Sequence, residues 1–161
     1  MKIGVRRADY SSKEDGRAIG FLLNAYASDP MGGGKPLPKG MIHNIAVELS
    51  RLPHAYSVIG SVDGRPAGLV NCFEGFSTFH CKPLVNIHDM VVLQKFRGNG
   101  LSIKMLEKVE EIALQKGCCK LTLEVLSGHR VAKSLYEKFG FSGYELDPKV
   151  GQALFWQKSL T

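Results

Sequence analysis

The chain has 161 residues, of which 44% are hydrophobic and 22% are charged, and these values suit one globular domain with a single core. The mean hydropathy of −0.06 argues against disorder. No run approaches the ~20 apolar residues of a membrane span, and the first residues lack the apolar region of a signal peptide. We therefore expect a soluble, cytoplasmic protein that does not bind a membrane.

The formal net charge of +6 favours an anionic partner. Lysine and arginine residues are spread along the chain, and neither a helix-turn-helix pattern nor an RNA-binding aromatic motif is present. We therefore expect a polyanionic cofactor and no nucleic acid. A nucleic-acid-binding module is an alternative that the charge alone motivates.

The four cysteines predict free thiols in a reducing compartment. They are Cys72, Cys81, Cys118 and Cys119. A zinc site could join Cys72 and Cys81 to His80 and His88, but this spacing matches no known ligand pattern. We therefore expect no metal.

In chain order, residues 2–7 predict a short strand, and the N-cap pattern at residues 11–14 predicts a helix that ends near Ala27. Residues 29–40 contain four glycines and three prolines, which predicts a long, mobile loop. Apolar residues at helical spacing then predict a second helix from Ile42 to about Leu52.

The middle of the chain predicts a sheet followed by a helix. Strands at residues 56–62 and 66–73 flank Asp63-Gly64, a strong hairpin signal, and a strand at residues 84–93 is expected in the same sheet. Residues 98–116 have the apolar periodicity of a helix. The core-facing residues of this helix are predicted to be Leu101, Met105, Leu106, Val109, Ile112 and Ala113.

The last third of the chain predicts a strand at residues 120–126, a helix at residues 130–139 and a final hairpin of residues 142–146 and 153–158. The order βααβββαβαββ, without repeats or linkers, describes a single α/β (α+β) domain over residues 1–161. We expect about four helices and a mixed, mostly antiparallel, twisted sheet of six to seven strands. The strand-helix-strand unit around Gly100 is predicted to be parallel.

Residues 97–102, Arg-Gly-Asn-Gly-Leu-Ser, lie between an apolar strand and this long helix. The first four N–H groups of a helix lack intrahelical partners and carry partial positive charge, so glycines that expose the backbone there predict an anion site. The P-loop pattern is absent, and Ile103 stands where a dinucleotide fingerprint requires a small residue. A phosphate ligand other than ATP, GTP or NAD is therefore favoured.

The chain resembles the GNAT superfamily of acyl-CoA-dependent N-acetyltransferases. Residues 97–102 match its Arg/Gln-x-x-Gly-x-Gly/Ala signature except at Ser102, and residues 135–141 match a second block, Leu-Tyr-Glu-x-x-Gly-Phe. The resemblance implies a single GNAT-like domain whose turn holds the pyrophosphate of acetyl-CoA. It also implies that the strand end at residues 90–92 splays and pairs with the pantetheine arm. The implied cofactor-binding residues are Met90, Val91, Val92, Arg97, Gly98, Asn99, Gly100, Leu101, Ser102 and His129.

The resemblance also suggests catalytic roles. Tyr136 is implied to donate a proton to the departing thiolate of CoA, although a half-buried packing role is the alternative. His88 or Asp89 would accept the proton of the amine, and strand alternation sends the two side chains to opposite faces, so only one can face the substrate. His88 is slightly preferred because it aligns with a glutamate that several family members carry, and a structural hydrogen-bonding role is the alternative for either residue. His129 could contact CoA or cap the following helix. Arg97 could meet phosphate or be a surface charge.

The expected reaction is direct transfer of an acetyl group from acetyl-CoA to a primary amine in a ternary complex. No cysteine lies in either block, which disfavours an acyl-cysteine route, and a backbone N–H of Val91 or Val92 could stabilise the carbonyl oxygen. The acceptor is an unidentified amine, either a small polyamine or amino sugar or a protein amine. A homodimer is left open. The alternative is a regulatory acyl-CoA-binding domain without turnover. It is motivated by three positions that depart from the family pattern, Ser102, His88 and His129.

Overall fold

The computed structural model describes residues 1–145 and 147–161, and the chain divides into two compact units, residues 1–123 and 124–161. The second unit contains α4 (Arg130–Phe139). The first contains, in chain order, β1 (Ile3–Arg7), α1 (Lys13–Ser28), α2 (Lys39–Ser50), β2 (Ala55–Val62), β3 (Arg65–Ser77), β4 (Lys82–Val92), α3 (Leu101–Gln115) and β5 (Leu121–Leu123).

The sheet of the first unit has five strands in sequence order, with three antiparallel pairings from β1 to β4 and a parallel pairing of β4 with β5. The parallel strand-helix-strand unit expected around Gly100 is therefore confirmed, as are the four α-helices and the mixed sheet. The expected strand at residues 120–126 is shorter and covers only Leu121–Leu123. It forms only where it pairs with β4.

The prediction of six to seven strands is wrong for the described residues, which form five. The expected hairpin strand at residues 142–146 ends on residue 146, which lies outside the described residues. In the rest of the C-terminal segment an isolated bridge joins Glu145 to Gln152. Strand-like patterns become strands only through a ladder of paired residues, and one bridge is not a ladder.

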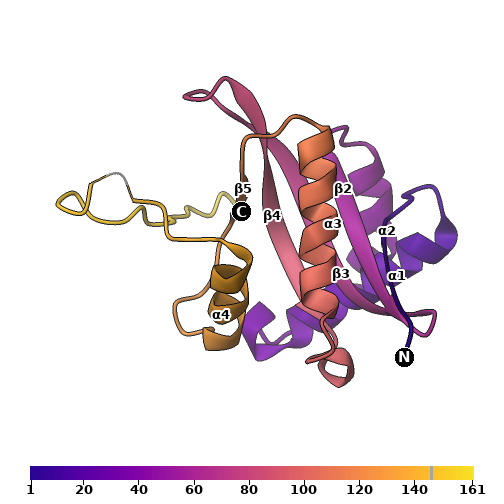
Figure 1. Ribbon diagram of the computed structural model, residues 1–161. Helices are drawn as coiled ribbons and strands as arrows, with labels where there is room; N and C mark the ends of the chain where they lie inside the picture. Colours follow the sequence, from indigo (N-terminus) through magenta and orange to yellow (C-terminus); the bar gives the residue numbers. More distant parts are fainter. Residues whose placement is uncertain (146) are drawn as a thin grey trace. The chain divides into compact units, whose positions relative to one another are not determined.

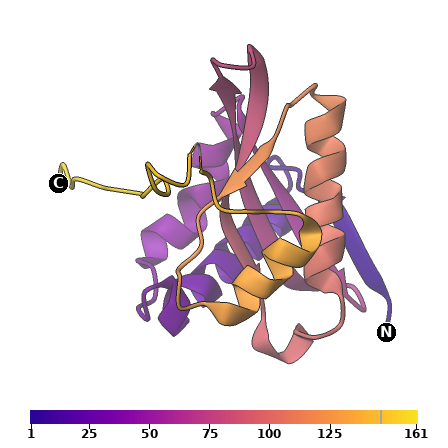
Figure 2. The same ribbon diagram turned by 60° about the vertical axis from the view of Figure 1, so that its left-hand side comes forward.

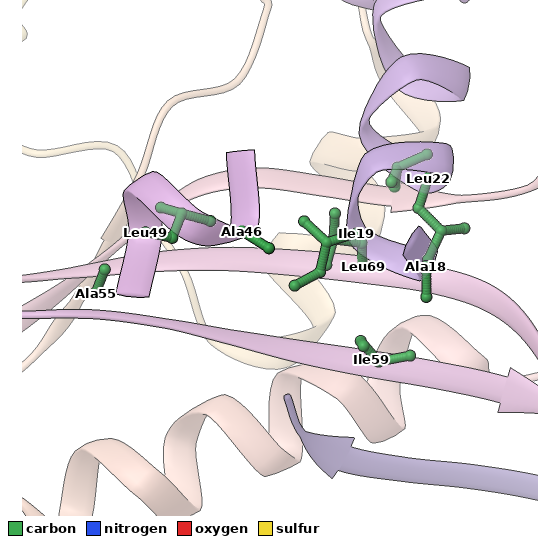
Figure 3. Packing of buried hydrophobic residues seen from close by; sticks show 9 residues of the cluster. Ala18, Ile19, Leu22, Ala46, Leu49, Ala55, Ile59 and Leu69 are labelled. Atoms are coloured by element: carbon green, nitrogen blue, oxygen red, sulfur yellow. The ribbon is translucent and has the colours of Figure 1, made fainter. Parts of the chain in front are cut away.

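Helices cover both faces of the sheet of the first unit. Figures 1 and 2 show α3 along one face and α1 and α2 on the other. Between the sheet and α1 and α2 lies a hydrophobic cluster, which Figure 3 shows from close by. Its members come from both helices and three strands: Ala18, Ile19, Leu22, Ala46, Leu49, Ala55, Ile59, Leu69 and Val91. We call the face of the sheet that carries this cluster the α1/α2 face.

The opposite face packs against α3, whose buried residues are the six that the sequence predicts. The helix approaches the sheet closely at Gly60 and Gly68. A Cβ atom at Gly68 would lie 2.7 Å from Met105 Cε and 3.0 Å from the Val91 carbonyl oxygen. Glycine therefore suits this contact, since a Cβ would force the Met105 side chain to shift and would crowd the Val91 carbonyl oxygen.

The segment between α1 and α2 is shorter than the sequence predicts, because α2 begins at Lys39. Hydrogen bonds also hold it in place. The Leu37 N–H donates to Asn24 Oδ1 over 2.8 Å, and the Lys35 N–H donates to the Ala27 carbonyl over 3.0 Å. A short 3₁₀ helix at residues 30–32 starts at Asp29, whose carboxylate accepts from the Met31 N–H. The segment therefore has a defined conformation that hydrogen bonds stabilise, although its glycines and prolines predict a mobile loop.

None of the described helices is long and apolar enough to cross a membrane.

Candidate active site

A β-bulge interrupts the pairing of β3 with β4 at the candidate catalytic residues. Asn71 lies opposite Asp89, whereas the next residue, Cys72, lies opposite Ile87. His88 is therefore the extra residue on β4. A bulge of this kind shifts the alternation of side chains by one position and often re-aims a side chain near a functional site.

The bulge places His88 and Asp89 over the same face of the sheet. Asp89 Oδ2 accepts a hydrogen bond from Asn71 Nδ2 over 3.0 Å, and the His88 ring meets the Phe73 ring edge to face at 5.5 Å. These two partners lie two and four residues after Leu69 on β3, so their side chains share the face that carries the hydrophobic cluster, and Phe73 packs against that cluster. The expectation that the two side chains point to opposite faces is therefore wrong, because alternation assumes an uninterrupted ladder.

Within the first unit, the last residues of β4 pair on one side only. The splaying that the family resemblance implies stays a prediction. The pairing of β4 with β5 ends at Ile87, whereas the pairing with β3 continues to Val92. The Leu93 N–H donates to the Ala67 carbonyl of β3 over 2.9 Å. Since paired and unpaired positions alternate along an antiparallel ladder, the Val91 amide faces β3, and those of Met90 and Val92 face away. Within the first unit, the outward amides of Met90 and Val92, not that of Val91, are therefore the candidates to meet a cofactor.

The glycine turn before α3 has the backbone conformation that the anion-site prediction requires. Gly98 and Gly100 both have φ of 79°, a left-handed conformation that residues with a Cβ rarely adopt. Gly100 is the N-cap of α3, and no side chain caps the helix there. The first amides of α3 are therefore available to an anion. The Leu101 side chain is buried in the core, so only its backbone could contact a cofactor.

Arg97 joins the glycine turn to two other segments. Its Nε donates to the Val92 carbonyl over 2.9 Å, and its guanidinium forms an ion pair with Asp29 over 3.2 Å. Arg97 is thus more than an isolated surface charge. Its guanidinium remains half exposed, so contact with a phosphate is compatible with both interactions. The phosphate role itself stays a prediction.

The second unit holds the remaining two predicted residues. His129 is the N-cap of α4, where its Nδ1 accepts from the Ala132 N–H over 3.4 Å. This is the capping role that the sequence left open beside a contact with CoA. The half-buried Tyr136 ring meets the Phe141 ring edge to face at 5.8 Å. The helix has the predicted bounds and ends at Gly140, which has φ of 108°.

A chain of polar side chains crosses the sheet to Asp89, and sequence analysis did not find it. Tyr10, before α1, is hydrogen-bonded to Ser57 over 2.8 Å, and Ser57 is hydrogen-bonded to Asn71 over 2.6 Å. Asn71 in turn donates to Asp89. Ser57 and Asn71 are 0% and 3% exposed. Polar residues at core-facing positions of two neighbouring strands were the signal that could have revealed this chain.

Tyr10 of this chain and Tyr26 of α1 have raised pKa values. Burial raises the pKa of the Tyr10 hydroxyl. Burial also raises the pKa of Tyr26, and the negative charges of Asp89 and Asp29 raise it further. Both phenols therefore stay protonated at neutral pH and can act as hydrogen-bond donors on the α1/α2 face.

A pocket of about 410 Å³ lies elsewhere, between β1 and α3, with Arg6, Lys108 and Glu111 among its lining residues. It contains none of the residues that the sequence motifs single out, so we place the candidate site at the end of β4. In the described residues, no group of three or more His, Cys, Asp or Glu side chains is arranged to hold a metal ion.

The acetyltransferase (GNAT) family model matches residues 22–141. The match covers most of the chain, including both sequence blocks, and the chain therefore belongs to the GNAT family. Relatives and solved structures extend this finding. An uncharacterized N-acetyltransferase of Bacillus subtilis, YhfO, is 28% identical over 151 residues, which cover 90% of this chain and 91% of that protein.

The chain is also similar to thialysine N-epsilon-acetyltransferase of Bos taurus, with 33% identity over 86 residues. That match covers 50% of this chain and 49% of that protein, so the chain spans about half the length of this relative. A solved aminoglycoside N-acetyltransferase in complex with CoA has a TM-score of 0.75 at 18% identity, covering 98% of this chain and 95% of that one. This likeness supports the shared fold.

Proposed function

We propose that this protein transfers an acetyl group from acetyl-CoA to a primary amine by direct attack in a ternary complex. The observation that carries the proposal is the end of β4, where the outward amides of Met90 and Val92 precede the uncapped helix start at Gly100. The strand edge can pair with the pantetheine arm, and the helix amides can bind the pyrophosphate. Membership in the GNAT family supports the same assignment.

We assign the acceptance of the amine proton to Asp89 in preference to His88. Both lie on the α1/α2 face, but Asp89 is half buried and held by Asn71, whereas His88 is exposed. An unperturbed primary amine is almost fully protonated at pH 7, so a carboxylate can first bind the ammonium and then take its proton. The deprotonated nitrogen attacks the acetyl carbon, and the bond from that carbon to sulfur breaks.

Two further groups complete the proposed chemistry. The Val92 N–H, which faces away from β3, can donate to the carbonyl oxygen as negative charge develops on it. Tyr136 supplies the proton that the departing thiolate takes up, a role that rests on the match of residues 135–141 to the second family block. Starting from the bound ammonium, the nitrogen loses two protons. Asp89 takes the first before the attack, and the second, released as the amide forms, balances the proton that Tyr136 passes to the thiolate, so charge and atoms balance.

The acceptor is proposed to be a small amine. The names of two similar proteins mention thialysine and aminoglycosides, and both compounds carry primary amines. A protein amine is the competing class, and the sequence offers no motif that selects between them. The two units are proposed to form one acetyltransferase domain, since the matched residues cross the boundary at residues 123 and 124. A cytoplasmic location and a homodimer stay predictions.

The test combines calorimetry with acetyl-CoA and a thiol-release assay over a panel of amines. The panel contains thialysine, lysine, spermidine, an aminoglycoside and a peptide with a free N-terminus. We expect acetyl-CoA to bind and at least one amine to accelerate the release of CoA. Binding of acetyl-CoA with no amine-dependent release would contradict the enzyme proposal and support an acyl-CoA-binding regulatory domain.

A further inference from the structure

We infer that Asn71, supported by Ser57 and Tyr10, is a positioning residue that orients the Asp89 carboxylate toward the acceptor amine. This inference rests on the proposed function of Asp89. The four side chains come from the segment before α1 and from β2, β3 and β4, and consecutive members are 2.8, 2.6 and 3.0 Å apart. No family block contains Tyr10, Ser57 or Asn71, so the chain of contacts is a feature of this fold that motifs do not reveal.

The direction of each hydrogen bond follows from the donors available. Asn71 uses its Nδ2 on Asp89, and its Oδ1 accepts from the Ser57 hydroxyl. A serine hydroxyl carries one hydrogen, which this contact uses, so Tyr10 must donate its own hydrogen to Ser57. Every donor in the chain therefore points toward Asp89, and the amide of Asn71 cannot flip without placing its oxygen against the carboxylate.

This arrangement leaves one carboxylate oxygen of Asp89 for a ligand. Oδ2 receives the Asn71 amide, and no hydrogen bond within the described residues engages Oδ1. Asp89 also forms no ion pair with a described lysine or arginine. A half-buried carboxylate with one oxygen fixed and one open is suited to bind a cation from the substrate side. A primary ammonium has the charge and the donors for this position.

The buried members of the chain indicate a role beyond packing. Ser57 and Asn71 lie among apolar side chains, where buried polar groups cost free energy unless they are hydrogen-bonded. Apolar residues would fill the same core positions without that requirement. Among the described residues, no buried side-chain nitrogen or oxygen lacks a hydrogen-bond partner, and the chain ends at Asp89, beyond the last β4 residue that pairs with β5. A relay of fixed donors holds the carboxylate in one orientation.

The test is a double-mutant cycle with Asn71→Ala and Asp89→Asn, in which kcat/KM for the amine is measured in each variant. We expect Asn71→Ala to lower kcat/KM by about 10-fold to 100-fold, the range for the loss of a hydrogen bond to a charged group. The Kd for acetyl-CoA should remain unchanged. In the Asp89→Asn background, Asn71→Ala should have little further effect, because the residue acts through Asp89.

Asn86→Ala is the matched control, because this β4 asparagine donates to Thr122 Oγ1 over 3.0 Å and does not contact Asp89. Its kcat/KM should stay near that of the wild type. Equal effects of Asn71→Ala in the wild type and in the Asp89→Asn background would overturn the inference. A loss of stability caused by Asn71→Ala does not change this result, because both proteins that carry the substitution share that loss of stability. The proposed function fails separately, if the wild type shows no amine-dependent release of CoA.

Discussion

Arg97 is predicted to bind phosphate, but its side chain also makes hydrogen bonds within the protein. Its side chain contacts the Val92 carbonyl and Asp29, so it connects the end of β4, the turn before α3 and the segment after α1. If the guanidinium also binds phosphate, then Asp29 competes with the cofactor for the same charge. This competition makes the two roles separable by mutation.

We predict that Arg97→Ala weakens the binding of acetyl-CoA about tenfold or more, because a charge-assisted hydrogen bond to phosphate is lost. Asp29→Ala is the control, since it removes the ion pair and leaves the guanidinium in place. Its affinity for acetyl-CoA should be unchanged or higher. Isothermal titration calorimetry measures both values. An equal loss of affinity in the two variants would show that Arg97 acts only through its pairing with Asp29.

Tyr136→Phe removes the proposed proton donor and preserves the ring that meets Phe141. We expect kcat to fall by about 100-fold or more, the contribution typical of general acid catalysis, with little change in the Kd of acetyl-CoA. Steady-state kinetics with the best amine from the panel measures the effect. A kcat equal to that of the wild type would exclude Tyr136 as the acid and leave it a packing role.

At the scale of elements, the contact of α3 with the sheet depends on glycine. We predict that Gly68→Ala lowers the free energy of unfolding by about 1–3 kcal/mol, because the added Cβ would contact Met105 and the Val91 carbonyl oxygen. Gly40→Ala is the control, since no atom lies within 4 Å of its Cβ position and its helical backbone suits alanine. Urea unfolding compares the two. A stable Gly68→Ala variant would mean that Met105 can move aside.

The start of α1 is linked to β1 by a buried carboxylate. The Arg6 guanidinium donates two hydrogen bonds to Asp15 and lowers its pKa, burial opposes this effect, and the Asp9 N–H adds to it. The Asp15 side chain is 3% exposed. Because the pKa of Asp15 is lower in the folded state, its contribution to stability is present above the unfolded value of about 4 and is lost as the pH falls.

We predict that Asp15→Asn costs about 1.5–3 kcal/mol at pH 7, the range for hydrogen bonds to a charged group, since the partner Arg6 is 57% exposed and leaves no buried charge behind. The difference from the wild type should shrink as the pH falls below about 4, because Asp15 is then protonated in the unfolded chain, and it should vanish once the pH falls below the lower pKa of the folded state. Urea unfolding at several pH values measures it. A difference that is constant from pH 7 to pH 3 would show that Asp15 contributes by its shape and not by its charge.

At the scale of the whole molecule, cofactor binding should stabilise the fold. A ligand that binds only the folded state at 100 times its Kd adds about 2.7 kcal/mol. For a protein of this size we expect acetyl-CoA to raise the Tm by about 5–10 °C. Thermal unfolding monitored by fluorescence measures the shift, and Arg97→Ala should reduce it at the same ligand concentration. An unchanged Tm at saturating acetyl-CoA would contradict specific binding.

The sequence by itself determined the features that depend only on residues close together along the chain. The glycine turn at Gly98 and Gly100, the core face of α3 and the bounds of α4 were all predicted correctly, because caps, periodicity and left-handed glycines are local signals. Two short blocks also identified the GNAT family, which the family model confirms. The strand count failed because a strand requires a partner that local patterns do not specify.

Only the tertiary structure decided how the candidate catalytic residues are oriented. The bulge at His88, the ion pair of Arg97 with Asp29, and the chain from Tyr10 to Asp89 each join segments that are far apart in the sequence. Register between two strands is set by the packing of the whole sheet, and a shift of one residue turns every following side chain to the other face. Local sequence therefore identified the cofactor turn, whereas long-range pairing decided where Asp89 points.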